Sequence, residues 1–144
     1  MSFVLKTRLD EPIPERLAFA GVKTMYGGKA VKAGDELFLF ASETSGGRGL
    51  AARGQVEQAR AAPRRPGPER QTPRMDLDVR VMALTQERLG RAELKTFTDW
   101  DDGRPQSELN FKFYRQATDK LCGVSPEAAQ YLASFFDGGA PSKP

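Results

Sequence analysis

The 144-residue chain has no histidine, one cysteine and one tryptophan. Without histidine it lacks imidazole-based zinc sites, serine–histidine and cysteine–histidine nucleophile pairs, and the usual general base near neutral pH. The lone cysteine, Cys122, excludes intramolecular disulfides and CxxC metal sites. These absences favour binding over catalysis, and we expect no catalytic residues, no metal and no cofactor.

Long apolar runs are also absent, and the mean hydropathy is -0.54. No stretch approaches the roughly 20 residues of a membrane helix, and the charge at Lys6 interrupts the N-terminal apolar stretch too early for a signal peptide. We therefore expect a cytoplasmic protein with no membrane partner. The length and the 39% hydrophobic content predict one domain, residues 1–138, followed by a flexible tail, residues 139–144.

Basic charge is concentrated in the middle of the chain, as arginine. Residues 48–91 hold 10 arginines, no lysine and 5 acidic residues, whereas the segments on either side are neutral or acidic overall. Arginine presents a planar fork to phosphate and can stack on bases. The same composition is explained by a solvated loop whose arginines reflect a GC-rich genome. Arginine content alone therefore does not indicate a nucleic-acid partner.

Strand patterns occupy much of the chain. The strongest, 36–41, is almost wholly apolar and predicts a central strand buried on both faces. Residues 75–83 alternate apolar and charged side chains, which is typical of a strand with one wet face. Further strands are predicted at 2–7, 22–26, 49–56, 109–114 and 120–124.

Two helices are predicted near the ends of the chain. Pro14, a following apolar run and Gly21 are the signals of a short helix. Ser125 is a good cap for a second helix, in which residues 126–136 place apolar side chains on one face. Short strands joined by hairpin-sized turns predict an α+β fold: a small, mixed but mostly antiparallel β-barrel with peripheral helices.

The centre of the chain resembles the EVE domains of the PUA-like superfamily. The likeness lies in the Gly34-Asp35 turn, the apolar strand that ends near Ser42, and the return strand from Gly49 to Val56. Residues 40–46 are also similar to the related YTH domains. The resemblance implies a PUA-like barrel that binds single-stranded or modified DNA or RNA and recognises one base in a pocket.

A base pocket needs an aromatic face for stacking and polar groups for the base edge. We expect Tyr26 and Trp100 as its walls, because an apolar core explains them least, with Thr7 and Ser42 at its polar edge. Each also has an ordinary structural interpretation, as a strand-end or loop-anchoring residue. The segment 109–114 offers two more candidates for base contact, Asn110 and Tyr114.

Phosphate contacts are expected from basic side chains around the mouth of the pocket. Five arginines of the middle segment are predicted to share one mouth of the barrel: Arg48, Arg64, Arg65, Arg70 and Arg74. Lys112 and Arg115, beside the aromatic residues of 109–114, complete the predicted phosphate contacts.

Two other functions stay open. The sister ASCH group, also PUA-like, contains hydrolases of modified nucleosides or RNA, and the start of its Gly-x-Lys pattern is present at Gly21 and Lys23. Tyr26 and Gly28 replace the glutamate and arginine that should follow, which leaves Lys23 and Glu43 as the polar pair for catalysis. A protein-interaction domain without a nucleic-acid role is the third interpretation.

Overall fold

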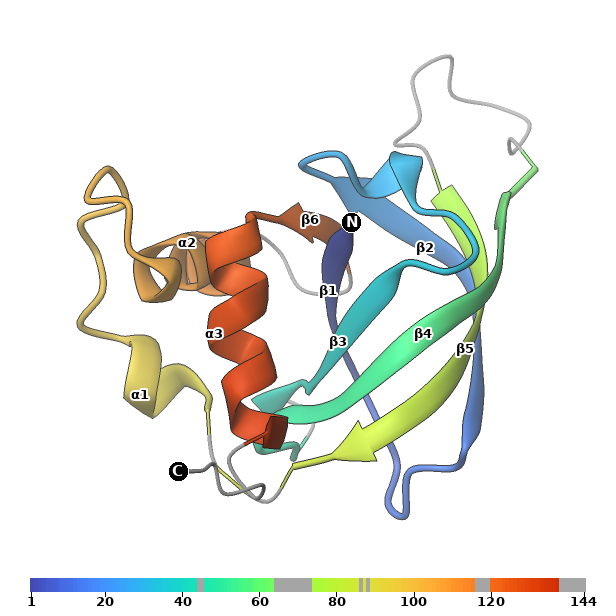
Figure 1. Ribbon diagram of the computed structural model, residues 1–144, viewed down its shortest axis with the longest axis horizontal. Coiled ribbons are helices and arrows are strands. Elements are labelled where there is room, and N and C mark those ends of the chain that lie inside the picture. The colour runs from blue at the N-terminus through green and yellow to red at the C-terminus, as the bar shows by residue number, and fades with distance from the viewer. Residues whose placement is uncertain (44–45, 64–73, 86, 88, 116–119, 138–144) are drawn as a thin grey trace.

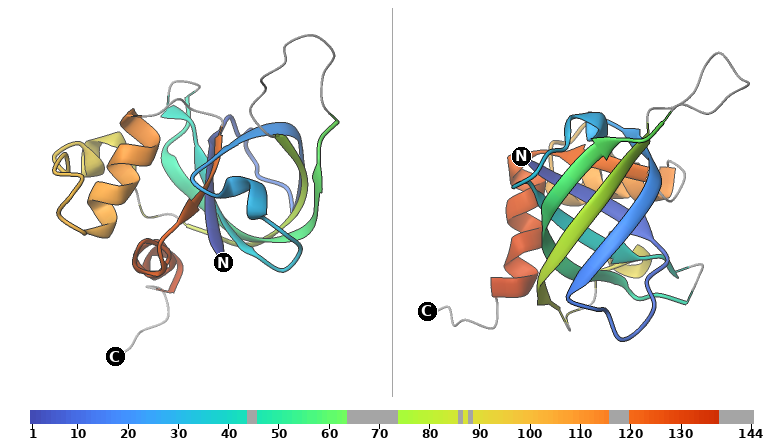
Figure 2. Two further views of the ribbon diagram at one scale, coloured as in Figure 1. Left: turned by 90° about the horizontal axis from the view of Figure 1, so that it is seen from above. Right: turned by 90° about the vertical axis from the view of Figure 1, so that its right-hand side faces the viewer.

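The computed structural model describes residues 1–43, 46–63, 74–85, 87, 89–115 and 120–137, with the backbone alone at 114, 115 and 137. Within these residues, six strands form a closed barrel in the order β1-β3-β4-β5-β2-β6. Figure 1 shows the barrel with the helices gathered on one side of it, and Figure 2 shows the same arrangement in two further views. The small α+β barrel predicted from the sequence is confirmed.

The strands are β1 (Ser2–Thr7), β2 (Arg16–Met25), β3 (Glu36–Ala41), β4 (Gly49–Ala61), β5 (Arg74–Leu84) and β6 (Lys120–Val124). The helical elements are the short turn η1 (Gly28–Ala30), α1 (Arg91–Leu94), α2 (Pro105–Asn110), the π-helical turn η3 (Phe111–Arg115) and α3 (Pro126–Asp137). Strand β1 pairs parallel with β3, and β2 pairs parallel with β6. The other neighbouring strands are antiparallel, so the barrel is mixed but mostly antiparallel.

Strand β3 lies between two hydrophobic cores. Successive side chains of a strand point to opposite faces, so Leu37 and Leu39 enter the barrel interior while Phe38 and Phe40 pack towards the helices. All four are fully buried, and each contributes about 1.5–3 kcal/mol by its transfer from water. The prediction of a central strand buried on both faces is confirmed.

The short helix predicted after Pro14 is wrong, because this segment forms strand β2. Leu17 and Phe19 alternate with exposed alanines, and pairing with β5 lets both pack against the barrel core. Gly21 does not end a helix: it has φ 63 and lies at a bulge where the register between β2 and β5 shifts. Tertiary pairing therefore overrode the local helix signals.

The strand predicted at 109–114 is also wrong, because these residues are helical in α2 and η3. Leu109 and Phe113 are both buried, and their spacing of four puts them on one helix face. The same residues with Phe111 also fit a strand period of two, so the pattern is ambiguous between the two structures.

Helix α3 has the cap predicted from the sequence, since the backbone N–H of Ala128 donates to Ser125 Oγ at 3.1 Å. Ala128 and Leu132 are fully buried against the outer face of the barrel. In the part of the chain that the structure describes, no helix is long and apolar enough to cross a membrane.

Candidate nucleic-acid interface

Three basic side chains stand in one row across neighbouring strands. Lys23 on β2 is in register with Arg74 on β5 and with Lys120 on β6. Cross-strand partners point to the same face of a sheet, so these residues form a cationic row, called here the basic row. Among the described residues, no carboxylate forms an ion pair with any of the three. Like charges placed opposite one another are destabilising, and a bound anion would relieve this repulsion.

The basic row borders a cleft of about 530 Å³ between β1 and β2. Leu5 and Thr7 line the β1 side, and Phe19 lies on the β2 side with the bulge that follows it. No acidic side chain of the described residues lines this cleft. Its volume falls in the range of about 300–1,000 Å³ that is typical of small-molecule sites.

The bulge at Gly21 is held from both sides by strand β5. Its backbone N–H donates to Asp76 Oδ1 at 2.7 Å, and its carbonyl oxygen accepts from Arg74 Nη1 at 3.1 Å. These two bonds fix the wall of the cleft and orient the Arg74 guanidinium beside it. The cleft wall is therefore organised without a ligand.

The structure brings Thr7 and Arg74, from the set predicted for nucleic-acid contact, to this cleft. Lys23 was considered only for catalysis, and Lys120 and Phe19 were missed. The pairing register of the strands brings Lys23, Arg74 and Lys120 together. This register cannot be read from residue types or from local spacing in the sequence. Phe19 was missed because its segment was assigned to a helix.

Ser42 and Glu43 lie after β3, on the other side of β6 and β1 from Lys23. Ser42 is buried, and its backbone N–H donates to the carbonyl of Thr7 at 2.8 Å. The Glu43 carboxylate accepts hydrogen bonds from the backbone N–H of Arg91 at 3.0 and 3.2 Å. The structure thus does not bring Lys23 and Glu43 together as an acid–base pair.

The prediction that the five arginines share one mouth of the barrel is wrong for Arg48 and Arg74. Arg48 precedes the first residue of β4, whereas Arg74 lies beside the last, because Ala61 pairs with Met75. The 13 residues of β4 separate the two side chains by about 40 Å of strand. The predictions for Arg64, Arg65 and Arg70 lie outside the described residues.

A second recess lies against α2 and the loop before it. Its volume is about 570 Å³, and it is lined by Thr98, Asp99, Trp100, Asp101, Gly103, Arg104, Glu108 and Phe111. We call it the aromatic pocket. It shares no described lining residue with the cleft between β1 and β2.

Tyr26 and Trp100, the predicted walls of one pocket, both contact Phe111. The ring centroids of Trp100 and Phe111 are 5.3 Å apart at 63°, and those of Tyr26 and Phe111 are 5.8 Å apart at 62°. Both residues keep about two fifths of their surface exposed, as expected for side chains outside the core. Thr7 lines the other recess, and Tyr26 and Ser42 line neither, so the structure does not bring the four predicted residues together in one pocket.

Asn110 holds Trp100 in place. Its Oδ1 accepts a hydrogen bond from Trp100 Nε1 at 2.9 Å, and its Nδ2 donates to the carbonyl of Leu94 at 2.7 Å. Asn110 is only 5% exposed, so contact with a base would require these bonds to break. The side chains of Tyr114 and Arg115, also predicted to bind nucleic acid, are outside the described set.

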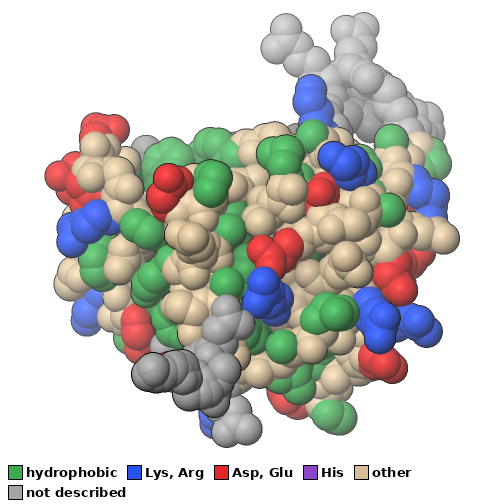
Figure 3. Space-filling view, in the orientation of Figure 1, with side chains coloured by type: hydrophobic (Ala, Val, Ile, Leu, Met, Phe, Trp, Pro, Cys, Tyr) green, Lys and Arg blue, Asp and Glu red, His purple; other side chains and the backbone are tan. Residues whose placement is uncertain are grey.

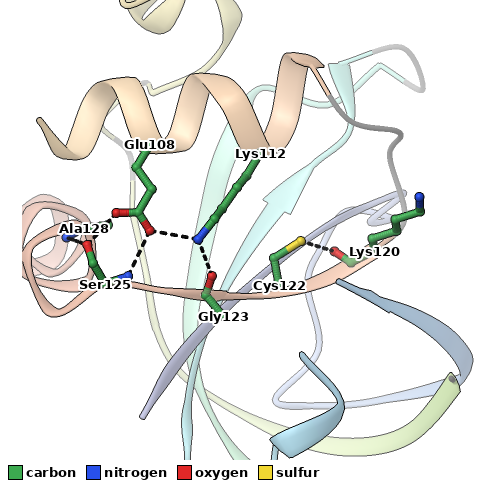
Figure 4. Close-up of polar contacts among 7 residues, drawn as sticks. All are labelled: Glu108, Lys112, Lys120, Cys122, Gly123, Ser125 and Ala128. Atoms are coloured by element: carbon green, nitrogen blue, oxygen red, sulfur yellow. Dashed lines mark hydrogen bonds and ion pairs between the residues drawn. The ribbon is translucent and has the colours of Figure 1, made fainter. Parts of the chain in front are cut away.

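A polar network joins α2 to β6 and to the start of α3 (Figure 4). Glu108 accepts hydrogen bonds from the hydroxyl and the backbone N–H of Ser125, and from Lys112 Nζ at 2.9 Å. Burial alone would raise the pKa of Glu108, but these donors outweigh it and hold the pKa below its usual value.

The ammonium group of Lys112 is used inside the protein. Besides Glu108, it donates to the carbonyl of Gly123 and lies 5.3 Å from the centroid of the Tyr26 ring. Contact with a phosphate, as predicted from the sequence, would require these interactions to be given up.

Nearby, burial raises the pKa of the Cys122 thiol to about 11, so the thiolate is scarce at neutral pH.

Figure 3 shows charged side chains of both signs over the face drawn in Figure 1, with hydrophobic side chains between them. No single field of one charge covers this face. The functional assignment therefore depends on the two recesses and their individual lining residues.

The fold is shared with solved structures of other proteins. The DUF55 domain of human thymocyte nuclear protein 1 superposes with a TM-score of 0.65 and 17% identity, over 93% of this chain and 97% of that chain. Human THYN1 protein in complex with DNA that contains 5-methylcytosine superposes with a TM-score of 0.65 and 17% identity, over 92% of this chain and 95% of that chain. A protein from Pseudomonas putida superposes with a TM-score of 0.65 and 17% identity, over 94% of this chain and 99% of that chain.

No family model and no curated protein matches the sequence. The structural neighbours nevertheless share the fold of this chain, a small mixed β-barrel with helices on one side, and one of them is a DUF55 domain. At this level of identity the comparison concerns the fold, and the function has to be argued from the chain's own residues.

Proposed function

We propose that this protein binds nucleic acid, with one base in the cleft between β1 and β2 and the flanking phosphates on the basic row. The observation that carries the proposal is the basic row itself. Lys23, Arg74 and Lys120 lie in register beside the cleft, and none of the described residues that line the cleft is acidic. Neutralising phosphates with such cations releases counterions, which drives binding. The DNA complex of human THYN1 protein, which has the same fold, supports the same ligand class.

The base in this proposal is single-stranded or turned out of a duplex, because the cleft opens between two strands of a barrel and cannot reach a stacked base. Phe19 offers an apolar surface, and the Thr7 hydroxyl can exchange hydrogen bonds with a base edge. Stacking on an aromatic ring contributes about 1–3 kcal/mol per base.

Recognition of a modified base is the finer part of the proposal. A methyl group placed against Phe19 gains about 0.8 kcal/mol, which corresponds to roughly fourfold tighter binding. Base discrimination of this size is smaller than the phosphate contribution. It therefore has to be measured between oligonucleotides of equal length and charge.

Base contact by Tyr26 and Trp100 stays a prediction from the sequence. In the structure Trp100 lines the aromatic pocket and Tyr26 contacts Phe111 of its lining, and neither residue lines the cleft beside the basic row. The substitution Trp100→Ala in a binding assay decides the matter: a loss of nucleic-acid affinity would place the base at Trp100 and would contradict the cleft.

Fluorescence anisotropy with labelled single-stranded DNA and RNA of equal length, with and without 5-methylcytosine, tests the proposal. Unmodified protein should bind, and Lys23→Glu should weaken binding without lowering the melting temperature, because it removes repulsion within the basic row. Lys95→Glu is the matched control, because Lys95 is exposed next to α1 and lines neither recess. Equal loss in both variants would show general attraction to a basic protein, and no binding by the unmodified protein would overturn the proposal.

A further inference from the structure

We infer that the aromatic pocket is a second binding site, for a methylated ammonium group, and that it is independent of nucleic-acid binding. The inference rests on the aromatic walls of the pocket, the charge at its rim and the carboxylate of Glu108, whose two oxygens already accept hydrogen bonds from the protein. It does not depend on the cleft between β1 and β2, since the two recesses share no described lining residue.

The walls are two aromatic rings set at an angle. Trp100 and Phe111 meet at 63° with centroids 5.3 Å apart, and both line the pocket. The hydrogen bond from Trp100 Nε1 to the buried Asn110 fixes the indole, so this wall is organised before a ligand arrives. A tryptophan face attracts cations more strongly than the other aromatic side chains do.

The rim of the pocket is acidic. Asp99 and Asp101 flank Trp100 in the sequence and line the recess, and neither carboxylate has a hydrogen bond or ion pair with the described residues. Arg104 also lines the pocket, but its guanidinium pairs with Asp102 at 2.8 Å and lies over the Phe97 ring. The charge available to a ligand is therefore negative, which selects a cation.

The floor distinguishes one kind of cation from another. Both oxygens of Glu108 already accept hydrogen bonds, from Ser125 and Lys112 (Figure 4). An ordinary ammonium that enters past the exposed rim carboxylates would leave water and find these oxygens already in use, so its three N–H donors would not all be satisfied. A methylated ammonium carries the same charge with few or no donors, so it loses less on leaving water and keeps its attraction to the rings.

Titration followed by tryptophan fluorescence tests the inference directly, because Trp100 is the sole tryptophan of the chain. The probes are tetramethylammonium, choline and a trimethyllysine peptide, against sodium chloride at equal ionic strength and the unmodified lysine peptide. We expect saturable binding of the methylated probes, and the trimethyllysine peptide should bind about tenfold tighter than the unmodified one. Choline and the peptide distinguish a small free cation from a protein side chain as the source of the group.

Two variants keep the outcome clear. Asp101→Asn should weaken binding of the methylated probes several-fold without lowering the melting temperature, while Asp10→Asn, at an exposed position outside the pocket, should leave it unchanged. A neutral tert-butyl analogue that binds as well as its trimethylammonium counterpart would overturn the inference, as would a linear response with no saturation. Lys23→Glu should not affect this binding, so failure here and failure of the nucleic-acid proposal are separate results.

Discussion

The two recesses of this molecule differ in how they are built and in the charge that they present. The cleft between β1 and β2 is bordered by cations that three strands bring into register, although they are far apart in the sequence. The aromatic pocket is built within residues 98–111 and carries carboxylates at its rim. A net charge of +3 describes neither place. The comparison shows that the topology of the barrel sorts charge into places of opposite sign, which the net charge of the chain does not reveal.

The largest effect is expected from reversing two charges of the basic row. Lys23→Glu with Lys120→Glu should lower affinity for a single-stranded oligonucleotide by about 100-fold and reduce the salt slope of the binding constant by about 2. Anisotropy titrations at several salt concentrations measure both quantities. The matched control is Lys32→Glu with Lys95→Glu, at two exposed positions outside both recesses. If this control lost as much, the two regions would not differ in the way described.

The next effect concerns stability on the side of the aromatic pocket. Glu108→Gln removes a charged acceptor that links α2 to Ser125 and Lys112, so the free energy of unfolding should fall by about 1–2 kcal/mol. Denaturant unfolding measures it, with Glu87→Gln as an exposed control. Nucleic-acid affinity should be unchanged. A stable variant that loses that affinity would show that the two regions are coupled.

The same carboxylate predicts a pH dependence. Because the pKa of Glu108 is lower in the folded protein than its usual value, its contribution to stability is complete near neutral pH and is lost as the pH falls below about 4. Unfolding of the unmodified protein and of Glu108→Gln should therefore differ at pH 7 and converge in acid. A difference that stayed constant down to pH 3 would mean that the bonds do not depend on the charge.

A loss of stability of similar size is expected at the bulge that forms the cleft wall. Gly21 has φ 63 with open space around its Cα, so Gly21→Ala should cost about 1–2 kcal/mol of backbone strain without a steric clash. Thermal unfolding measures the loss. Gly103→Ala, at φ 80 and also in open space, is the matched control in the aromatic pocket. Both should lower stability, but only Gly21→Ala should weaken nucleic-acid binding.

The smallest effect is expected at Cys122. Its thiol is buried and its pKa is raised to about 11, so a thiol reagent at pH 7 should react far more slowly than with a free cysteine. The rate of reaction with an aromatic disulfide reagent measures this. Fast labelling of the native protein would show that the packing of β6 opens readily.

Much of the fold could be predicted from the sequence, because its main patterns are local. The predictions of a buried strand at 36–41 and of a helix cap at Ser125 are confirmed, because the signals for burial and capping lie within a few residues of sequence. The errors fell where local signals conflict with pairing: Pro14 and Gly21 suggested a helix, yet Leu17 and Phe19 gain their burial through β5. No pattern within one segment reveals a partner strand.

The site was less predictable for the same reason. Lys23, Arg74 and Lys120 lie in one row only because β2 pairs with β5 on one side and β6 on the other. Trp100 and Asn110, ten residues apart, are both selected from the sequence as base contacts, and the structure joins them by a hydrogen bond from Trp100 Nε1 to Asn110 Oδ1 that the sequence pattern does not reveal. Residue type indicates the candidates, and only the fold shows which of them lie together.

The most direct test of the nucleic-acid proposal is a two-dimensional amide NMR titration of the protein with a short single-stranded oligonucleotide. The account predicts that the amide signals of Thr7, Gly21, Lys23 and Lys120 shift, because these residues line or border the cleft. The single indole signal, from Trp100, should stay in place. Shifts centred on Trp100 and Phe111, with no change around Gly21 and Lys23, would contradict the account.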